Sequence, residues 1–579
     1  NECVFQAKRS GDAHVMTYQV LQALDQCREF RTLDEHVARI VSTLPNLQQQ
    51  RDGLRRVLDS LIQRRLLVSD RDFVARLATT DAPAPAPLRA IFIRASDRPA
   101  QLERLLDTLA DYERRFRPGR HYVVLDDSRL GASADRHRDL VREFARATGC
   151  KLTYVGAAER AKLVERLSKA IPSARVALEG MLLSQPGQAR FGGGRSWNLA
   201  LLLSAGARFV IFDDDQRLPL RRHELAKSGL DPNPSAAAFA RFYRNMEEAL
   251  AAGEELGVDP IQLHLDACGL PLGTLTAQND YAIRRENLRG LNLGRLAHFE
   301  SRARVLATAQ GAYGSSRTES GAWLYQLDPD SRADFWRDRA SYLANIEAQH
   351  IWYGVGQAKV GNMTYFTPFS FDNSELLPCT NAIGRGEDAL FSAVAHFLHP
   401  QALVLELPVA IGHVQEAARK RSPITLAAST PRFNHFVCEF VQRQFGLFIA
   451  SDPAQRLHLL ADLLRDVAGA SETARIAHLR EYLNYVRADS VDRLQQQFEA
   501  VKNAPVYWQA DVRSIIEANG KALIAKSAPR LGDWPEDAEA PACAAALASE
   551  LRQLADAYEA WPAAWDAARE QGERLLGTV

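Results

Sequence analysis

Strand-like and helix-like segments alternate between residues 88 and 216, and this alternation constrains the fold of the 579-residue chain more than any other feature. The strand-like runs are rich in β-branched and aromatic residues and cover residues 90–93, 121–125, 151–155 and 208–212. Leucine stripes at helical spacing lie between them. Such alternation predicts an α/β fold with a parallel sheet covered by helices on both faces. Ligands bind such sheets beyond the carboxyl ends of the strands.

Three carboxylates, Asp213, Asp214 and Asp215, follow the last of these strands directly. Alternate residues of an extended chain point to the same side, so Asp213 and Asp215 can face one ligand together. Adjacent carboxylates repel one another unless a cation lies among them. Carboxylate oxygens suit hard divalent ions that also bind substrate phosphates. We therefore predict a metal–diphosphate site here, with Asp213 and Asp215 as metal ligands; a solvated acidic turn is the alternative.

Polar residues also follow the earlier strands. Arg94, Ser96 and Arg98 lie in the exit loop of the first strand, and Asp126 and Asp127 end the second. The aspartate pair could equally form a turn and a helix N-cap. The run 192–194 consists of glycine, which lets backbone N–H groups approach an anion at a helix N-terminus, although such a run is also typical of a flexible loop.

The segments "IFIRASDRP", "VVLDDS", "GGGRSWNLALLLSAGARFVIFDDD" and "GRGEDALF" occur in this order and resemble the ordered motifs of family-two-type glycosyltransferases with the GT-A fold. The resemblance covers roughly residues 88–216 and 360–415. It implies a Rossmann-like central domain and a hexosyl- or N-acetylhexosaminyltransferase that uses a nucleotide-diphosphate sugar, in particular a UDP-sugar. Residues 217–360 depart from the compact family pattern and are interpreted as an insertion or an expanded acceptor region.

The resemblance assigns roles to the strand-end residues. Arg94, Ser96 and Arg98 would lie near the nucleotide, and Asp126 or Asp127 would bind its base. The remaining roles are a nucleotide contact for Arg195 and Asn198, a ribose contact for Asp213 or Asp214, and a metal contact for Asp215.

Glu387 and Asp388 precede a helix that carries Leu390 and Phe391. In inverting relatives the aspartate of this pair is the general base that deprotonates the acceptor hydroxyl, so the resemblance implies that role for Asp388. Glu387 would bind or orient the acceptor. A base must lie within ~2.6–3.2 Å of the proton it removes, directly or through one water. Alternatively, both residues simply complement the dipole of the helix.

A strand at residues 403–412 ends at His413, which matches the place where many GT-A enzymes supply a further metal ligand. Imidazole is better tolerated by Mn²⁺ than by Mg²⁺, so His413 favours manganese, with magnesium as the alternative. Residues 415–423, with basic residues at 419–421, are interpreted as a lid over the diphosphate or as a solvated linker.

Residues 1–78 are predicted to form a small helical domain that ends in a β-wing at residues 64–68. Their order is similar to winged-helix domains that bind leader peptides in peptide-modifying enzymes, which implies a peptide or protein acceptor; a plain structural domain is the alternative. Residues 79–87 are an Ala-Pro linker, which favours extended polyproline II. The central domain is placed at 88–425 with its insertion at 217–360, and a helical domain at 426–579.

Three further expectations concern the rest of the chain. Residues 217–300 are expected to be mostly helical, with a helix at 236–250, and residues 305–325 to form a surface loop or, alternatively, a mobile loop near a ligand. The C-terminal helices are interpreted as a packing domain, an oligomerisation surface or an acceptor-holding module.

Composition limits the partners. Lys+Arg and Asp+Glu both total 71, so net charge gives no case for binding nucleic acid or an anionic membrane. No run approaches the ~18 apolar residues of a membrane span. Seven cysteines without metal spacing indicate reduced thiols in the cytoplasm.

Together these patterns predict a metal-dependent glycosyltransferase that transfers a sugar to an acceptor hydroxyl of a peptide, protein or glycan with inversion. The alternatives are a retaining glycosyltransferase, a nucleotidyltransferase, and a non-catalytic peptide-binding scaffold on a degenerate transferase core.

Overall fold

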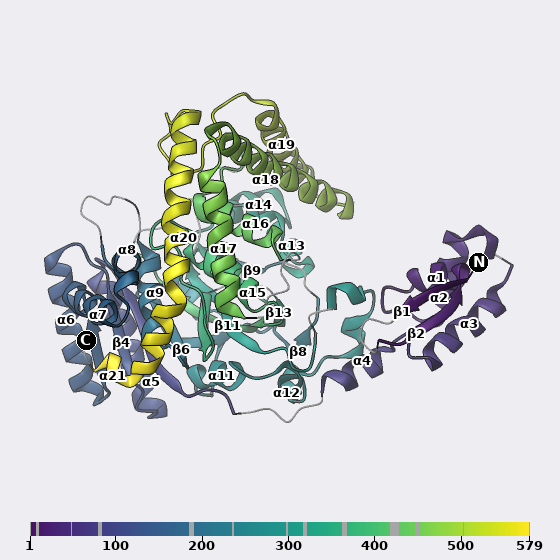
Figure 1. The fold of residues 1–579 in the computed structure, drawn as a ribbon. Coiled ribbons are helices and arrows are strands. Elements are labelled where there is room, and N and C mark those ends of the chain that lie inside the picture. The colour runs from purple at the N-terminus through teal and green to yellow at the C-terminus, as the bar shows by residue number, and fades with distance from the viewer. Residues whose placement is uncertain are drawn as a thin grey trace.

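The computed structural model describes residues 2–6, 11–47, 49–78, 84–184, 190, 192–233, 237–296, 299–316, 321–361, 367–416, 428–445, 452–501 and 503–577. Figure 1 shows a mixed α/β body, a helical C-terminal region above it and a small N-terminal unit to one side. None of the described helices combines the length and apolar character that crossing a membrane requires.

One 13-stranded sheet forms the centre of the molecule, with nine strands in the order β10-β7-β15-β11-β14-β6-β3-β4-β5. The strands predicted between residues 88 and 216 are confirmed as β3 (Leu88–Ala95), β4 (Tyr122–Asp126), β5 (Leu152–Val155) and β6 (Ala207–Asp213). They pair in parallel, β3 lying between β4 and β6. Ile91, Phe92 and Ile93 are fully buried, because helices cover both faces of this part of the sheet.

The helices that connect these strands pack on the two faces. They are α5 (Pro99–Phe116), α6 (Gly131–Thr148), α7 (Ala157–Ala170), α8 (Arg175–Leu182) and α9 (Gly193–Leu203). One core cluster contains Leu102, Leu105 and Leu109 of α5, and another contains Trp197 and the leucines of α9. The predicted α/β class is therefore confirmed at this level.

The expectation that residues 217–300 are mostly helical is wrong over the first part of that range. This part contains the strands β7 (Gln216–Arg222), β8 (Lys227–Asp231), β9 (Phe239–Tyr243) and β10 (Glu254–Glu255). Leu218 and Leu220 are buried while the residues between and beside them are less so, which is the period of a strand. The helix expected at 236–250 is limited to α10 (Met246–Ala251), followed by α11 (Pro260–Ala267) and α12 (Leu272–Thr276).

The surface loop expected at residues 305–325 is also wrong. Residues Val305–Ser315 form the strand β11, and every residue of it is buried. Its small residues allow close approach of neighbouring strands: a Cβ on Gly311 would lie 2.3 Å from the carbonyl oxygen of Tyr353. The glycines that suggested a loop therefore serve strand packing.

The rest of the sheet comes from later segments. These are β12 (His350–Gly354), β13 (Gln357–Gly361), β14 (Thr367–Asn373) and β15 (Leu403–His413), the last matching the predicted strand. β14 runs antiparallel between β6 and β11, whereas β11 and β15 are parallel. Residues 217–360, expected as an insertion, thus contribute strands to the central sheet itself. Beside these strands lie the helices α13 (Pro329–Phe335) and α14 (Arg339–Glu347).

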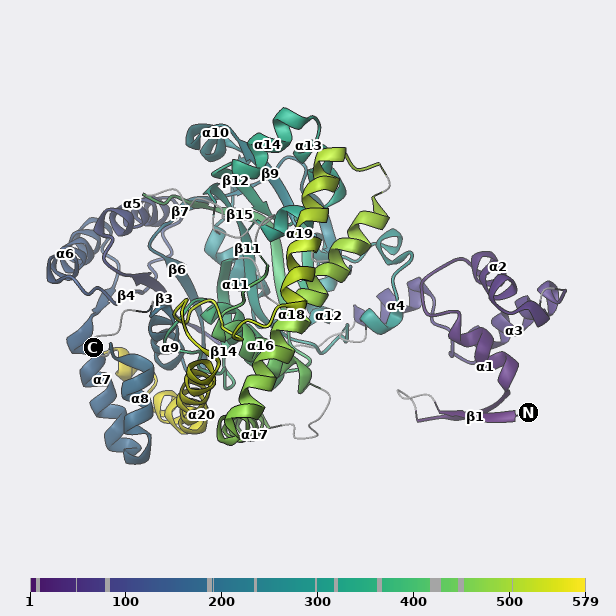
Figure 2. The same ribbon diagram turned by 90° about the horizontal axis from the view of Figure 1, so that it is seen from above.

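The predicted helical character of the C-terminal region is confirmed. After α15 (Glu387–Leu398), the helices are α16 (Phe433–Arg443), α17 (Pro453–Gly469), α18 (Glu472–Ala500), α19 (Val506–Ile524), α20 (Ala540–Gln571) and α21 (Glu573–Leu576). α20 packs along α17 and reaches α8 and α9 (Figures 1 and 2). The Trp561 indole donates to the carbonyl of Leu377 at 2.6 Å, and the Trp565 indole to Asn373 at 2.9 Å. Residues of α17 and α20 therefore share one core with α9 and α15.

The N-terminal unit contains β1 (Glu2–Gln6), β2 (Ala13–Thr17), α1 (Tyr18–Asp25), α2 (Leu33–Thr43), α3 (Arg51–Gln63) and α4 (Asp70–Leu77). The β-wing expected at residues 64–68 is wrong, because this segment ends α3 as a turn. Arg65 takes a left-handed conformation (φ 59°), and the N–H groups of Leu66 and Leu67 bond back to Leu61. The only paired strands of this unit among its described residues precede the helices.

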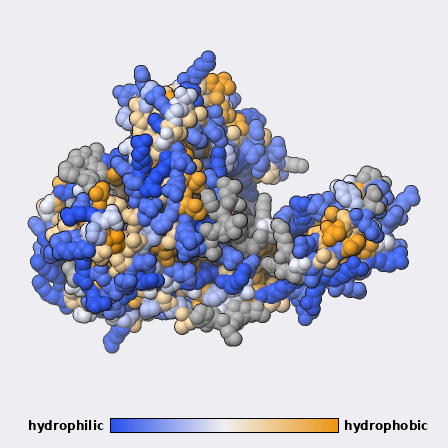
Figure 3. All heavy atoms as spheres, viewed as in Figure 1, coloured by the Kyte–Doolittle hydropathy of each residue, from blue (hydrophilic) through white to orange (hydrophobic). Residues whose placement is uncertain are grey.

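Ion pairs join the N-terminal unit to the rest of the molecule, from Arg285 to Asp70 and from Arg289 to Glu35. Its hairpin leaves Val4 and Val15 exposed, and the first residue of α1, Tyr18, is exposed beside them in the chain. Figure 3 shows apolar surface on this unit, while hydrophilic residues cover most of the visible face of the molecule.

Candidate functional site

The carboxyl ends of β3 and β6 lie side by side, as the parallel pairing requires. Arg94 is in register with Asp213, and its guanidinium binds the Asp213 carboxylate at 2.7 Å through Nε and 2.6 Å through Nη2. Asp213 is the most accessible of the three aspartates, with 39% of its side chain exposed. The two strand ends predicted to meet therefore do meet, but Asp213 already has a cationic partner.

Asp214 and Asp215 are buried behind Asp213 and face the β3 exit loop. The Ser96 N–H donates to Asp214 Oδ2 at 3.3 Å, and Arg98 Nη1 lies 3.3 Å from Asp214 and 3.6 Å from Asp215. Burial raises the pKa of Asp214 to about 8; Arg98 opposes this rise and the neighbouring carboxylates add to it. Burial also acts against ionisation of Asp215, but His413 and Arg98 outweigh it and hold the pKa of Asp215 below its usual range. Asp215 is therefore the anionic member of the pair.

His413 ends β15 and faces Asp215, with Nε2 at 3.3 Å from Oδ2. Its other ring nitrogen, Nδ1, lies 3.0 Å from the carbonyl oxygen of Ser315 at the end of β11. A carbonyl only accepts, so Nδ1 carries a proton. A ring protonated on both nitrogens donates from Nε2 to the Asp215 carboxylate, which is how His413 lowers the pKa of Asp215, whereas a neutral ring presents the Nε2 lone pair. Two facing acceptor atoms repel each other unless a proton or a cation lies between them. A metal ion bound to both side chains would remove that repulsion.

The three metal ligands predicted from the sequence are only partly brought together. Among the described residues, no group of three or more His, Cys, Asp or Glu side chains is arranged to hold a metal ion. Asp215 and His413 lie within 3.3 Å of each other and could share a cation, whereas Asp213 is engaged by Arg94. Two protein ligands fit a divalent cation that completes its coordination with water and substrate phosphate oxygens, which is the usual arrangement of Mg²⁺ in phosphate-binding sites.

Asp126 and Asp127 end β4 but have different surroundings. Asp126 is buried and accepts from the Tyr154 hydroxyl at 2.6 Å and the Ser128 N–H at 2.8 Å, with His137 Nδ1 at 3.1 Å. Burial would raise the pKa of Asp126, but these hydrogen bonds lower it to about 2. Asp126 is thus an internal anchor, and its alternative role in binding a nucleotide base has no support in the structure.

Asp127 instead carries two ion pairs near the strand ends. Its carboxylate lies 2.7 Å from Arg195 and 3.0 Å from Arg160. The predicted nucleotide-binding residues Asp127 and Arg195 are therefore in direct contact. Ser96 joins this group, since its hydroxyl donates to the Asp127 carbonyl at 3.3 Å.

Asn198 is fully buried and lies on the side of α9 that faces the chain before α15. Its side-chain oxygen accepts from the Thr380 N–H at 2.8 Å, and its amide donates to the Thr380 carbonyl at 3.0 Å. The Met181 carbonyl lies 3.4 Å from the same amide. These contacts occupy the amide group, so the expected nucleotide contact of Asn198 has no support here.

Packing also explains the glycine run that opens α9. A Cβ on Gly194 would lie 1.9 Å from the carbonyl oxygen of Asn381, and one on Gly192 would collide with the Arg195 guanidinium. The glycine residues therefore let α9 approach the 380–382 segment and leave room for Arg195. This requirement stands independently of any bound anion.

Glu387 and Asp388 begin α15 and lie beside Arg94. Arg94 Nη1 is 3.7 Å from Glu387 Oε1, so one guanidinium bridges Asp213 and Glu387. Burial raises the pKa of Glu387 to about 7, Asp388 adds to the rise and Arg94 opposes it. The guanidinium also lies over the Trp197 ring, with 5.1 Å between Cζ and the ring centroid. Asp388 keeps partial access to solvent.

The structure adds residues that the sequence did not suggest. Trp197 supports Arg94, and Ser315 orients His413. Gln415, the first residue of the predicted lid, donates to Asp215 at 3.3 Å. His435 of α16 adjoins the start of α15. No local pattern marks these residues, since each reaches the site from a different part of the chain. The predicted basic lid at residues 419–421 lies outside the described residues.

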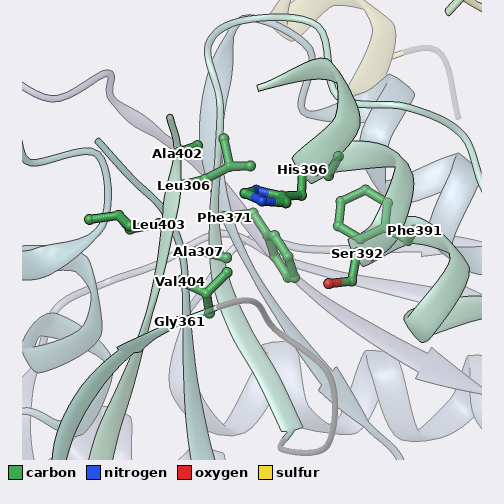
Figure 4. Close-up of a pocket in the computed structure, with 11 residues that line it drawn as sticks. Leu306, Ala307, Gly361, Phe371, Phe391, Ser392, His396, Ala402, Leu403 and Val404 are labelled. Carbon is green, nitrogen blue, oxygen red and sulfur yellow. The ribbon is translucent and has the colours of Figure 1, made fainter. Parts of the chain in front are cut away.

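A cavity lies at the other end of α15, away from these polar groups. It is lined by Leu306, Ala307, Gly361, Phe371, Phe391, Ser392, Ala395, His396, Ala402, Leu403 and Val404. Figure 4 shows the rings of His396, Phe371 and Phe391 turned toward it. His396 is nine residues after Glu387, which is about 14 Å along a helix. Phe391, which also lines the cavity, stacks on Trp197, so this aromatic pair lies between the cavity and Arg94.

No family model matches the chain, and no curated protein or solved structure matches it significantly. The functional assignment therefore depends on the residues and their geometry.

Proposed function

We propose that this protein is a metal-dependent glycosyltransferase of the GT-A type, which moves a sugar from a UDP-sugar to an acceptor hydroxyl with inversion. The observation that carries the proposal is the convergence of four separate segments at one sheet edge. The ends of β3, β6 and β15 and the start of α15 bring together Arg94, Arg98, Asp213, Asp214, Asp215, Glu387 and His413. Open α/β sheets bind ligands at this edge.

Under this proposal Asp215 and His413 hold a divalent cation, manganese or magnesium. When bound, the ion would neutralise charge that develops on the leaving diphosphate. The chain supplies further cations at the same edge, because Arg98 lies beside Asp214 and Asp215, and Arg195 beside Asp127. These side chains can exchange a carboxylate partner for a phosphate oxygen, since guanidinium groups bind both.

Asp388 is the proposed general base. It keeps partial access to solvent and adjoins Glu387, whose raised pKa leaves it partly protonated near neutral pH. A partly protonated Glu387 can donate a hydrogen bond to an acceptor oxygen, whereas Asp388 can accept the acceptor proton. The two adjacent carboxyl groups thus suit different roles, which favours an acceptor site at the start of α15.

The direct test is hydrolysis or transfer of UDP-sugars with Mn²⁺, read as release of UDP, in the wild type and in Asp215→Ala. The proposal expects metal-dependent UDP release that falls at least 100-fold in the variant. Activity that is unaffected by Asp215→Ala would contradict it.

NMR of the product's anomeric proton distinguishes inversion from retention, and retention would remove the base role of Asp388. Release of pyrophosphate instead of UDP would indicate nucleotidyl transfer, and absence of nucleotide binding would favour the peptide-binding scaffold.

A further inference from the structure

His435 lies in the first turn of α16, beside the start of α15. An ideal Cβ on Gly386 would be 3.2 Å from both Cε1 and Nε2 of the His435 ring, so the imidazole edge lies against the Gly386 backbone. Gly386 directly precedes Glu387 and has a left-handed conformation (φ 85°). The imidazole is therefore one residue away from the proposed acceptor-binding pair.

The first turn of α16 is held firmly, and His435 is its one solvent-exposed side chain. Phe433, Asn434, Phe436 and Val437 are buried, whereas His435 is exposed. Asn434 donates to the Arg385 carbonyl at 3.1 Å and accepts from Asn381 at 2.9 Å. The Phe433 N–H donates to Asp533 at 3.1 Å. These bonds fix α16 to the 381–388 segment and place the imidazole where solvent and ligands can reach it.

Three charged groups act on the imidazole from the elements around it. Surrounding protein lowers the pKa of His435; Asp388 and Asp533 raise it, and Arg432 lowers it. Asp388 also raises the pKa of Cys438, which is one turn further along α16. The packing of α15 against α16, with Gly386 against the His435 ring, places Asp388 and His435 on neighbouring turns of the two helices. A neutral imidazole at this position can donate one hydrogen bond and accept another.

We propose that His435 is an acceptor-binding residue whose imidazole N–H donates to the hydroxyl that Asp388 deprotonates. The inference rests on the proposed glycosyltransferase function. A hydroxyl has one proton and two lone pairs. The proton moves to the Asp388 carboxylate, one lone pair forms the bond to the anomeric carbon, and the other accepts from His435. The bond from the anomeric carbon to the diphosphate oxygen breaks, and its electron pair leaves with UDP.

The experiment uses the full chain with UDP-glucose, UDP-galactose and UDP-N-acetylglucosamine, with Mn²⁺ and water as the acceptor hydroxyl. His435→Ala is expected to lower the rate of UDP release about tenfold, the effect of losing one hydrogen bond. The Kd of UDP with Mn²⁺ should stay within twofold, because the imidazole lies at the start of α15. His435→Gln, which retains an N–H, should keep more activity than His435→Met, which has similar length and no donor.

The matched control is His478→Ala, an exposed histidine on α18. Wild-type rates in His435→Ala, or equal rates in the Gln and Met variants, would overturn the inference while leaving the proposed function intact. If the wild-type chain neither binds UDP nor releases it, the proposed function fails first and the inference fails with it.

An NMR titration of the His435 ring tests the geometry without turnover. Asp388→Asn should lower the pKa of His435, because it removes a negative charge that faces the ring. Arg432, Asp533 and Cys438 remain unchanged in that variant. An unchanged pKa would show that His435 and Asp388 do not share a site, and would overturn the inference.

Discussion

Asp215, in the turn between β6 and β7, faces His413 at the end of β15, with 3.3 Å between the carboxylate Oδ2 and the imidazole Nε2. The Ser315 carbonyl fixes the proton on the opposite ring nitrogen, so in the neutral ring the carboxylate meets a lone pair. Gln415 and Arg98 also donate toward Asp215. Arg98, Gln415 and the protonated state of His413 keep Asp215 anionic, and Asp215 and His413 are the two side chains that the proposed cation would bind.

The first prediction concerns metal binding at this pair. Asp215→Asn and His413→Ala should each weaken Mn²⁺-dependent binding of UDP by at least about tenfold, since each removes one of two protein ligands. The measurement is calorimetric titration of UDP with Mn²⁺ and again after chelation with EDTA. Asp135→Asn, an exposed change on α6, serves as the control. Equal UDP affinity with and without Mn²⁺ in the wild type would argue against the metal site.

The second prediction concerns the bridge that Arg94 forms between Asp213 and Glu387. Arg94→Met should lower the free energy of unfolding by roughly 1–3 kcal/mol. This loss is smaller than the loss on breaking a fully buried ion pair, because Asp213 is partly exposed. The loss should be larger at pH 8.5 than at pH 5.5. The folded-state pKa of Glu387 is already raised to about 7, and loss of the cation raises it further, so ionisation at high pH costs more stability.

Urea unfolding at the two pH values measures this effect. Arg480→Met, an exposed change on α18, is the matched control. Adding Glu387→Gln to Arg94→Met should remove most of the pH dependence. A loss that is equal at both pH values would mean that Glu387 does not depend on Arg94.

The third prediction concerns Glu406, a carboxyl group on β15 that pairs in register with Lys359 of β13. Burial raises the pKa of Glu406 to about 8, and Lys359 only partly opposes the rise. Because the folded-state pKa is above the unfolded value of ~4.3, wild-type stability should fall as pH rises from about 4.5 to 8. Glu406→Gln should remove the Glu406 share of this slope, leaving the shares of Asp214 and Glu387, and should stabilise the fold by a few kcal/mol at pH 8.

Thermal unfolding across this pH range checks the Glu406 prediction. Glu517→Gln, an exposed change on α19, should leave the slope unchanged. A Glu406→Gln profile parallel to the wild type would show that the carboxyl group ionises freely in the folded chain.

The fourth prediction separates structural and ligand-binding roles for Asn198. Asn198→Ala removes the acceptor of the Thr380 N–H and leaves that buried donor unpaired, which should cost about 2–4 kcal/mol. The Kd of UDP, measured well below the unfolding temperature, should be within twofold of the wild type. Asn503→Ala in an exposed turn is the control. A much weaker UDP affinity with little loss of stability would instead support the nucleotide contact that the sequence predicts for Asn198.

The strands of the first half could be predicted because their apolar runs are buried on both faces of the sheet. Residues 90–93 and 208–212 consist almost entirely of such residues, and the helices between them have regular leucine spacing. The segment 216–222 was missed because arginine alternates with leucine around Pro219, so its apolar run is short. β11 was missed because its alanine and glycine residues resemble a loop, although their small size serves close strand packing.

The site was predictable where strand order alone brings residues together. Arg94 meets Asp213 because the parallel neighbours β3 and β6 end at one edge. His413 meets Asp215 because β7, a strand that the sequence did not reveal, begins directly after Asp215 and pairs with β15. The surroundings of adjacent residues were not predictable: Asp126 points to His137 and Tyr154, whereas Asp127 points to Arg160 and Arg195. His435 depends on how α16 packs against residues 381–388, and nothing near residue 435 in the chain signals that contact.

The position of β14 between β6 and β11 has a consequence for how the chain is made. The strands β3 to β6 are synthesised early, but the strand that pairs with the second edge of β6 is β14, which consists of residues 367–373. Until that segment emerges, a hydrophobic strand with unpaired N–H and carbonyl groups stays available to other nascent chains. Heterologous production should therefore benefit from slower synthesis or from chaperones that occupy such edges.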